Sequence, residues 1–186
     1  TMKTFIAVLS LCFLGFENIL AQQGRLDSTF GTNGITLTAQ GNRAYGTAYM
    51  VDALPDGRII AGGHAQTGIV EPLMLVRFWP DGRVDSTFGE NGIALHARYR
   101  GIKLKILPDS KILILLDRGM GLLRLLPDGR EDSSFQRVAL ADDPDKKAYS
   151  SDFLVQSDGK ILVCGIGVGT PLDQFCMARY EPNGAP

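Results

Sequence analysis

The chain has 186 residues, of which 45% are hydrophobic and 21% charged, and its formal net charge is −1. This composition is that of a folded globular protein and not of a disordered one. The near-zero charge excludes the basic field that binding to nucleic acid or to an anionic membrane requires. The 22 glycines and 9 prolines indicate many short strands joined by tight turns.

Residues 1–21 have the layout of a secretory signal peptide. Lys3 precedes an apolar run from Phe5 to Phe16, and Ala21 stands just before a polar stretch. This order predicts export with cleavage after Ala21, and therefore an extracellular or cell-surface location. The apolar run is shorter than the ~20 residues that a membrane-spanning helix needs, so we expect no membrane span. A buried N-terminal helix is the alternative interpretation.

The cysteines and histidines of the mature chain do not indicate a metal site. Cys164 and Cys176 remain after cleavage, and they form either one disulfide bridge or, as we expect, two free thiols. His64 and His96 are the only histidines, and neither lies near a cysteine or the other histidine in the sequence. We therefore expect no zinc site and no cofactor.

Three motifs recur in the same order along the chain, which is the pattern of a repeat protein. The first contains Asp-Ser-Thr-Phe, the second Leu-Pro-Asp-Gly followed by apolar residues, and the third an arginine three residues before Pro-Asp-Gly. Copies of the first motif start at residues 24, 82 and 129. Copies of the second start at 54, 107 and 156, and copies of the third start at 75, 122 and 177. The chain after residue 21 is thus one repeat region, 22–186, with units at about 24–81, 82–128 and 129–184.

Each unit predicts four antiparallel strands, because Pro-Asp-Gly turns join hairpins and the flanking segments alternate with period two. The expected strands of the first unit are Ala48–Leu54, Arg58–Gly62, Leu73–Trp79 and Arg83–Leu95, the last with a break at 89–92. Four-stranded antiparallel sheets that repeat at about 50 residues are typical of β-propeller blades. A β-sandwich has no reason to repeat its motifs in order, and a parallel β-helix has shorter rungs and no hairpins. We predict an all-β fold of propeller blades.

The motifs Asp-Ser-Thr-Phe-Gly-x-Asn-Gly, Pro-Asp-Gly-Arg-Ile-Ile-Ala-Gly-Gly and Leu-Val-Arg-Phe resemble the delta-60 repeat, a β-propeller repeat of secreted bacterial proteins. The resemblance covers residues 24–184 and implies export and a propeller fold, with no shared catalytic residues. The middle unit departs from it, because Ser110 replaces the turn glycine and Leu115 and Leu116 replace a Gly-Gly pair.

The number of repeats predicts an incomplete propeller. Propellers have 4–8 blades, and this sequence holds about three repeats. We expect that either further repeats of the same chain or other copies of the chain close the ring.

The carboxylates indicate structural roles rather than catalysis. Most of them belong to the turns or to the repeated motif, and the acidic run at 142–145 lacks the ligand spacing of a calcium loop. We therefore expect a secreted or cell-surface binding or scaffold module, not an enzyme, with an unknown protein or glycan as ligand. The alternatives are a fragment of a lactonase-like or glycan-lyase-like propeller enzyme with a metal in its central channel, and a structural spacer in a large surface protein.

Two further expectations concern particular side chains. The hairpin register places Arg77 opposite Asp85 and Arg124 opposite Asp132, as structural ion pairs that fix the register. The Pro-Asp-Gly turns lie on one rim, so the variable loops lie on the other, where recognition is usually placed. The residues that we expect to bind a ligand there are His64, Gln66, Glu71, Arg98, Asp117, Asp142 and Asp143.

Overall fold

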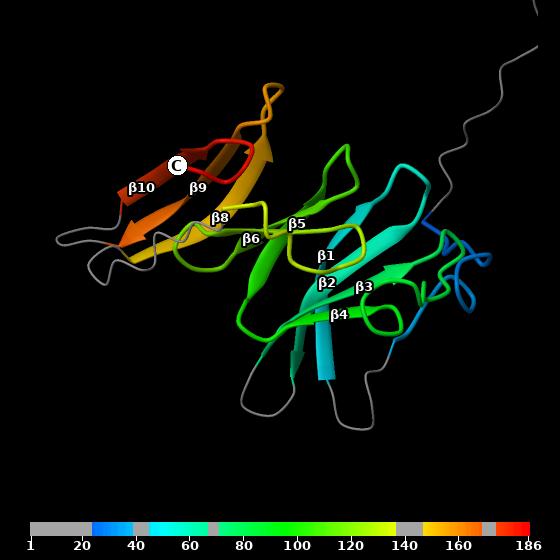
Figure 1. Ribbon diagram of the computed structural model, residues 1–186. Coiled ribbons are helices and arrows are strands. Elements are labelled where there is room, and N and C mark those ends of the chain that lie inside the picture. Colours follow the sequence, from blue (N-terminus) through cyan, green and yellow to red (C-terminus); the bar gives the residue numbers. More distant parts are fainter. Residues whose placement is uncertain (1–23, 39–44, 67–70, 137–146, 169–173) are drawn as a thin grey trace, which may run out of the picture.

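The computed structural model describes residues 24–38, 45–66, 71–136, 147–168 and 174–186 (Figure 1). This part of the chain consists of strands and turns and contains no helix, so it has no helix long and apolar enough to cross a membrane. The strands are β1 (Tyr45–Ala53), β2 (Ile59–Gln66), β3 (Leu73–Phe78), β4 (Ile93–His96), β5 (Gly101–Ile106), β6 (Ile112–Leu116), β7 (Leu122–Leu125), β8 (Lys147–Val155), β9 (Ile161–Val168) and β10 (Gln174–Tyr180).

The strands form three antiparallel sheets, in the orders β1-β2-β3-β4, β5-β6-β7 and β10-β9-β8. The sheets stand side by side in chain order, with residues 24–38 beside the first sheet and the C-terminus at the third (Figure 1). Strands β1, β5 and β8 are the first strands of their sheets in chain order, and β5 contacts both β1 and β8. The fold is therefore all-β, with antiparallel blades of a propeller, and the three described sheets do not close a ring.

The fourth strand differs from the sequence prediction. A single bridge joins Phe78 to Val84, and the regular strand β4 starts only at Ile93. Between them the chain makes two turns, in which Phe88 N donates to Asp85 O (3.2 Å) and Gly92 N donates to Phe88 O (2.8 Å). The expected break at 89–92 is present, but the expected strand from Arg83 up to that break was wrong, because the aspartate of the repeated motif closes a turn instead of extending a strand.

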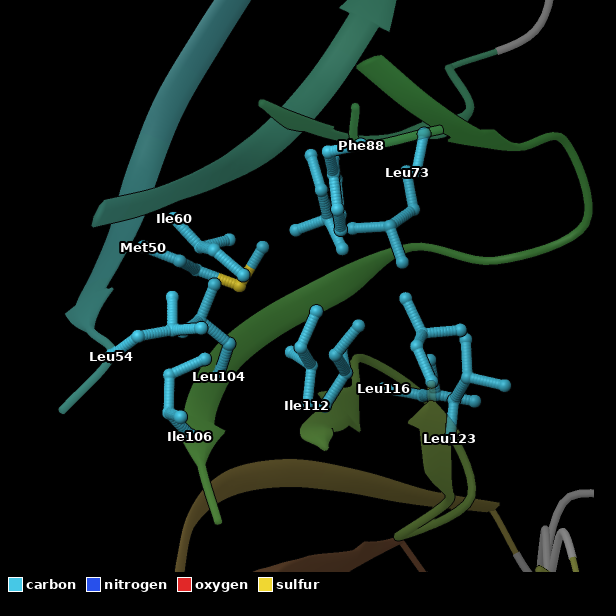
Figure 2. Packing of buried hydrophobic residues seen from close by; sticks show 14 residues of the cluster. Met50, Leu54, Ile60, Leu73, Phe88, Leu104, Ile106, Ile112, Leu116 and Leu123 are labelled. Carbon is cyan, nitrogen blue, oxygen red and sulfur yellow. The ribbon is translucent and has the colours of Figure 1, made fainter. Parts of the chain in front are cut away.

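The hydrophobic core lies between the sheets. One cluster fills the space between the first and second sheets, where Ile60 and Leu73 point toward Ile112 and Leu123 (Figure 2). A second cluster packs Leu113 and other side chains from the opposite face of β6 against the third sheet. All five residues of β6 are buried, as its unbroken apolar sequence predicts for a strand covered on both faces.

Each sheet has a β-bulge at the same point of its first strand. The extra residues are Tyr49, Ile102 and Ser151, each five positions before the turn motif. A bulge bends its strand and turns side chains in a new direction. In the third sheet the backbone approaches so closely there that a Cβ on Gly165 would lie 1.9 Å from the Tyr149 carbonyl oxygen. Only glycine fits at that point.

Candidate functional site

The candidate ligand site lies on the rim formed by the connections between sheets, which we call the loop rim. It comprises residues 71–73, 96–101, 117–121 and 148–150, and backbone hydrogen bonds join these segments across all three sheets. Leu73 N donates to Tyr99 O (2.9 Å), Asp117 N to Arg100 O (2.9 Å) and Ser150 N to Asp117 O (3.0 Å). The loop rim is therefore one continuous surface, held by the scaffold beneath it.

Three charged side chains from separate segments meet on the loop rim. Arg100 Nη1 lies 3.6 Å from a carboxylate oxygen of Glu71, and Arg100 Nε lies 4.0 Å from one of Asp117. More than half of the Arg100 side chain is exposed to solvent. An exposed guanidinium between two carboxylates keeps donors and acceptors free for a ligand, because these contacts do not use all of the five N–H groups of the arginine or all of the lone pairs on the four carboxylate oxygens.

Tyr49 and His64 extend this cluster along the first sheet. The Tyr49 hydroxyl donates to Gly101 O (2.7 Å), and its ring centroid lies 5.7 Å from that of His64. Burial raises the pKa of Tyr49, while the nearby charge of Arg100 acts in the opposite direction. The buried Nδ1 of His64 has no hydrogen-bond partner among the described residues. We call Tyr49, His64, Glu71, Arg100 and Asp117 the rim cluster.

Sequence reasoning identified part of the rim cluster. His64, Glu71 and Asp117 lie in it, whereas Arg98 is exposed and makes no ion pair among the described residues. Gln66 ends β2, but its side chain lies outside what the structure describes, as do Asp142 and Asp143.

Sequence reasoning missed Tyr49 and Arg100. Arg100 belongs to the same variable connection as Arg98, and nothing in the sequence distinguishes the two arginines. The bulge that displaces Tyr49 is equally invisible in the sequence.

The structure contains the arginine–aspartate pairs, and they are more than cross-strand contacts. Arg77 Nε donates to Asp85 Oδ2 (2.7 Å), with both side chains buried. Arg77 Nη1 donates to the carbonyl oxygen of Pro127, in the turn that follows β7 of the neighbouring sheet (2.6 Å). Arg124 repeats the arrangement: its Nε lies 2.8 Å from Asp132 Oδ2, and its Nη1 donates to the carbonyl oxygen of Pro182, in the turn that follows β10 of the third sheet. Each pair therefore ties two successive sheets together.

Hydrogen bonds keep these aspartates ionised. Burial raises the pKa of Asp85, but bonds from Thr87 and Arg77 outweigh it and lower the pKa to about 2. The pKa of Asp132 is likewise lowered, first by the hydroxyl of Ser134 and against the effect of burial. Both carboxylates are engaged by protein groups and serve the fold rather than a ligand.

The arginine of each pair also lies over an aromatic ring. The Arg77 guanidinium lies 4.9 Å from the centroid of the Phe88 ring, and Arg124 lies 4.6 Å from that of Phe135. The phenylalanine rings contact the turn glycines of the next sheet so closely that a Cβ on Gly129 would lie 2.9 Å from Phe88. The repeated Asp-Ser-Thr-Phe motif is thus the connector between blades.

The described residues hold no group of three or more His, Cys, Asp or Glu side chains that could bind a metal ion. Cys164 and Cys176 are free thiols, each half-buried. Cys176 Sγ lies 3.3 Å from the sulfur of Met120.

Residues 54–88 and 156–186 match a family described as "Domain of unknown function (DUF5122) beta-propeller". The chain is built of β-propeller repeats. The two matches begin at equivalent positions of the second repeated motif, Leu54 and Gln156. No curated protein matches the chain.

Among solved structures, the chain is similar to the crystal structure of a protein of unknown function from Bacteroides caccae. The sequence identity is 13% and the TM-score is 0.45. The match covers 78% of this chain and 49% of the other, so the chain spans about half the length of that protein.

Proposed function

We propose that this chain is an exported binding or scaffold module of delta-60-type propeller repeats, and that its ligand site is the rim cluster. One observation carries the proposal: Glu71, Arg100 and Asp117, from three separate connections, meet on one exposed rim. The opposite, turn-bearing rim repeats the same short aspartate–arginine contacts, such as Arg83 Nε to Asp81 Oδ2 at 2.7 Å and Arg130 Nε to Asp128 Oδ2 at 2.7 Å. Uniform turns maintain geometry, whereas polar groups gathered from different loops are typical of recognition surfaces.

The chemistry of the cluster favours a ligand rich in hydroxyl groups, such as a glycan. Arg100 can donate up to five hydrogen bonds, and the carboxylates of Glu71 and Asp117 can accept hydrogen bonds. A hydroxyl group both donates and accepts, so it can bond to either kind of side chain. The Tyr49 ring is partly exposed beside them and provides a flat apolar surface with a polar edge. The combination suits a sugar ring, which can stack one face on the Tyr49 ring while its hydroxyl groups form hydrogen bonds with the charged side chains.

A glycan array screened with the purified chain tests the ligand class and the site together. We expect binding to a defined set of glycans, and we expect the triple variant E71A/R100A/D117A to lose it. The matched control is R83A/R130A, because both arginines are largely exposed on the turn rim and should be dispensable. Arg58 does not serve as a control, since its guanidinium also reaches the buried Asp85 at 3.3 Å.

Two outcomes contradict the proposal. If the control variant loses binding and the triple variant keeps it, the ligand site is on the turn rim. If no glycan binds, the ligand class is wrong. Thermal unfolding of each variant shows whether the fold is kept.

Export is tested separately by expressing the complete chain in a bacterial host and sequencing the N-terminus of the exported protein. We expect the mature chain to begin at Gln22, after cleavage behind Ala21. Retention of the uncleaved chain in the cytoplasm would contradict export.

A further inference from the structure

The outer face of the third sheet is an uncovered apolar surface. Strand pairing places Phe175 opposite Ile166 and Met177 opposite Cys164, and it places Leu154 on the same face. Phe175 is 82% exposed and Met177 is 57% exposed, and Ile166 and Leu154 are also exposed. Contiguous exposed apolar side chains of this size mark an interaction surface.

The equivalent face of the middle sheet is covered by a neighbouring sheet. The residues of the middle sheet that correspond to Cys164 and Met177 are Leu115 and Leu122, and both are fully buried under the third sheet. The outer face of the third sheet is therefore of the kind that another blade covers.

The opposite end of the molecule is also uncovered. Val51 on β1 is 71% exposed, whereas Leu104, the corresponding residue of β5, is buried under the first sheet. A cavity of about 250 Å³ lies on this face of the first sheet, with Met74 and Phe78 in its wall. Leu37, beside the cavity, is almost fully exposed.

Each end also carries half of an arginine–aspartate pair. Arg179 stands three residues before Pro182, as Arg77 and Arg124 stand before their prolines. Unlike these two, Arg179 is exposed and has no ion pair among the described residues. Asp27, at the other end, is exposed and accepts hydrogen bonds from Thr29, and no arginine or lysine among the described residues pairs with it.

The half around Asp27 is already arranged to receive an arginine. Gly31 N donates to Asp81 O (2.8 Å), just as Gly89 N donates to Asp128 O (2.9 Å) where Arg77 is bound. Phe30 likewise contacts the turn glycine of the first sheet, as the corresponding phenylalanines contact theirs. The acceptor is formed, and none of the residues that the structure describes supplies its arginine.

We propose that these two ends bind each other between copies of this chain, head to tail. Arg179 of one copy donates to Asp27 and Thr29 of a second copy, and the face around Phe175 packs against the face that carries Val51 and Leu37. A second copy fits because it presents both the opposite charge and the complementary apolar face in the repeated blade geometry. The contact is heterologous, so it produces a closed ring or a filament according to the angle between copies. This assembly is independent of ligand binding at the rim cluster.

Sedimentation velocity of the 186-residue chain over a wide concentration range tests the proposal. We expect species of at least twice the monomer mass that dissociate on dilution. R179D and D27R each place like charges at the contact and should weaken association at least ~10-fold, which corresponds to the loss of one desolvated charge pair. F175S should weaken it further by removing the apolar contact.

The charge-swapped double variant D27R/R179D distinguishes this contact from any other, because it restores opposite charges and should restore association. R98D is the matched control, since Arg98 is exposed on the loop rim, and should associate like the parent chain. A chain that stays monomeric, association that R179D and D27R leave unchanged, or a double variant that fails to recover would each overturn the proposal. Far-UV circular dichroism establishes that each variant is folded.

Discussion

Replacing Asp85 with asparagine should destabilise the fold far more than the same change at Asp27. The two aspartates occupy the same position of the repeated motif, and each accepts a 2.6 Å hydrogen bond from the hydroxyl of a threonine two residues later. Only Asp85 also binds an arginine, since Arg77 Nε lies 2.7 Å away and both side chains are buried. The comparison separates the turn-capping role of the motif from its ion-pair role.

The expected magnitude follows from the charge that the substitution leaves behind. Asparagine keeps the size and one acceptor oxygen of Asp85 but removes the counter-ion of the buried Arg77 guanidinium. Removing one partner of a buried pair costs about 3–5 kcal/mol. Arg77 keeps its bonds to Pro127 O (2.6 Å) and Thr87 Oγ1 (2.8 Å), so we expect the lower end, about 3 kcal/mol. This is a large part of the roughly 5–15 kcal/mol that holds a domain folded.

Urea unfolding, followed by far-UV circular dichroism and by the fluorescence of Trp79, the single tryptophan, measures the effect. With a slope of about 1–3 kcal/mol per molar urea, a loss of about 3 kcal/mol lowers the midpoint by roughly 1–3 M. At a protein concentration low enough to keep the chain monomeric, so that the proposed contact between copies does not contribute, D27N should leave the midpoint close to that of the parent chain. Equal midpoints for D85N and D27N would refute the argument that the buried ion pair, and not the turn cap, makes Asp85 important.

Three further predictions concern stability. Because the pKa of Asp85 lies at about 2 in the folded chain against its usual 3.8, the ionised side chain stabilises the fold above pH 3.8. That contribution, about 2 kcal/mol, is lost as the pH falls through about 2. Other aspartates with a lowered pKa, such as Asp132, remain in D85N, so the urea midpoint should fall with pH in both chains but fall further in the parent chain than in D85N. G165A should cost roughly 1–3 kcal/mol because its Cβ would meet the Tyr149 carbonyl oxygen, whereas G167A, whose Cβ makes only ordinary contacts, should be nearly neutral in thermal unfolding. L115A should cost about 2–5 kcal/mol in the same measurement, because Leu115 is fully buried between two sheets.

Much of the local structure could be read from the sequence because it depends on short-range chemistry. Period-two alternation and Pro-Asp-Gly turns predict hairpins, and the hairpin count alone places Arg77 beside Asp85. The fourth strand could not be read in this way. The segment from Arg83 to Phe88, before the predicted break, contains the strand-forming residues Val84 and Phe88. The Asp85 carboxylate and carbonyl accept hydrogen bonds from backbone N–H groups a few residues later and so divert the chain into turns.

The candidate site was only partly predictable, since its members come from distant parts of the chain. Glu71, Arg100 and Asp117 lie in three connections whose sequences share no motif. Their position in polar loops makes these residues candidates for ligand binding. Which of the side chains lie close together depends on how neighbouring sheets are aligned. Hydrogen bonds between connections, such as Asp117 N to Arg100 O, set that alignment.

The repeat, the hairpins and the hairpin register follow from the sequence, because they depend on interactions among residues close in the chain. Which face of each sheet is covered, and what each charge contacts, depends on how the sheets pack against one another. Arg77 and Arg179 stand in equivalent sequence positions, yet one is buried against the next sheet and the other is exposed. The difference is the presence of a neighbouring blade, because burial and the strength of an ion pair depend on what excludes water from it.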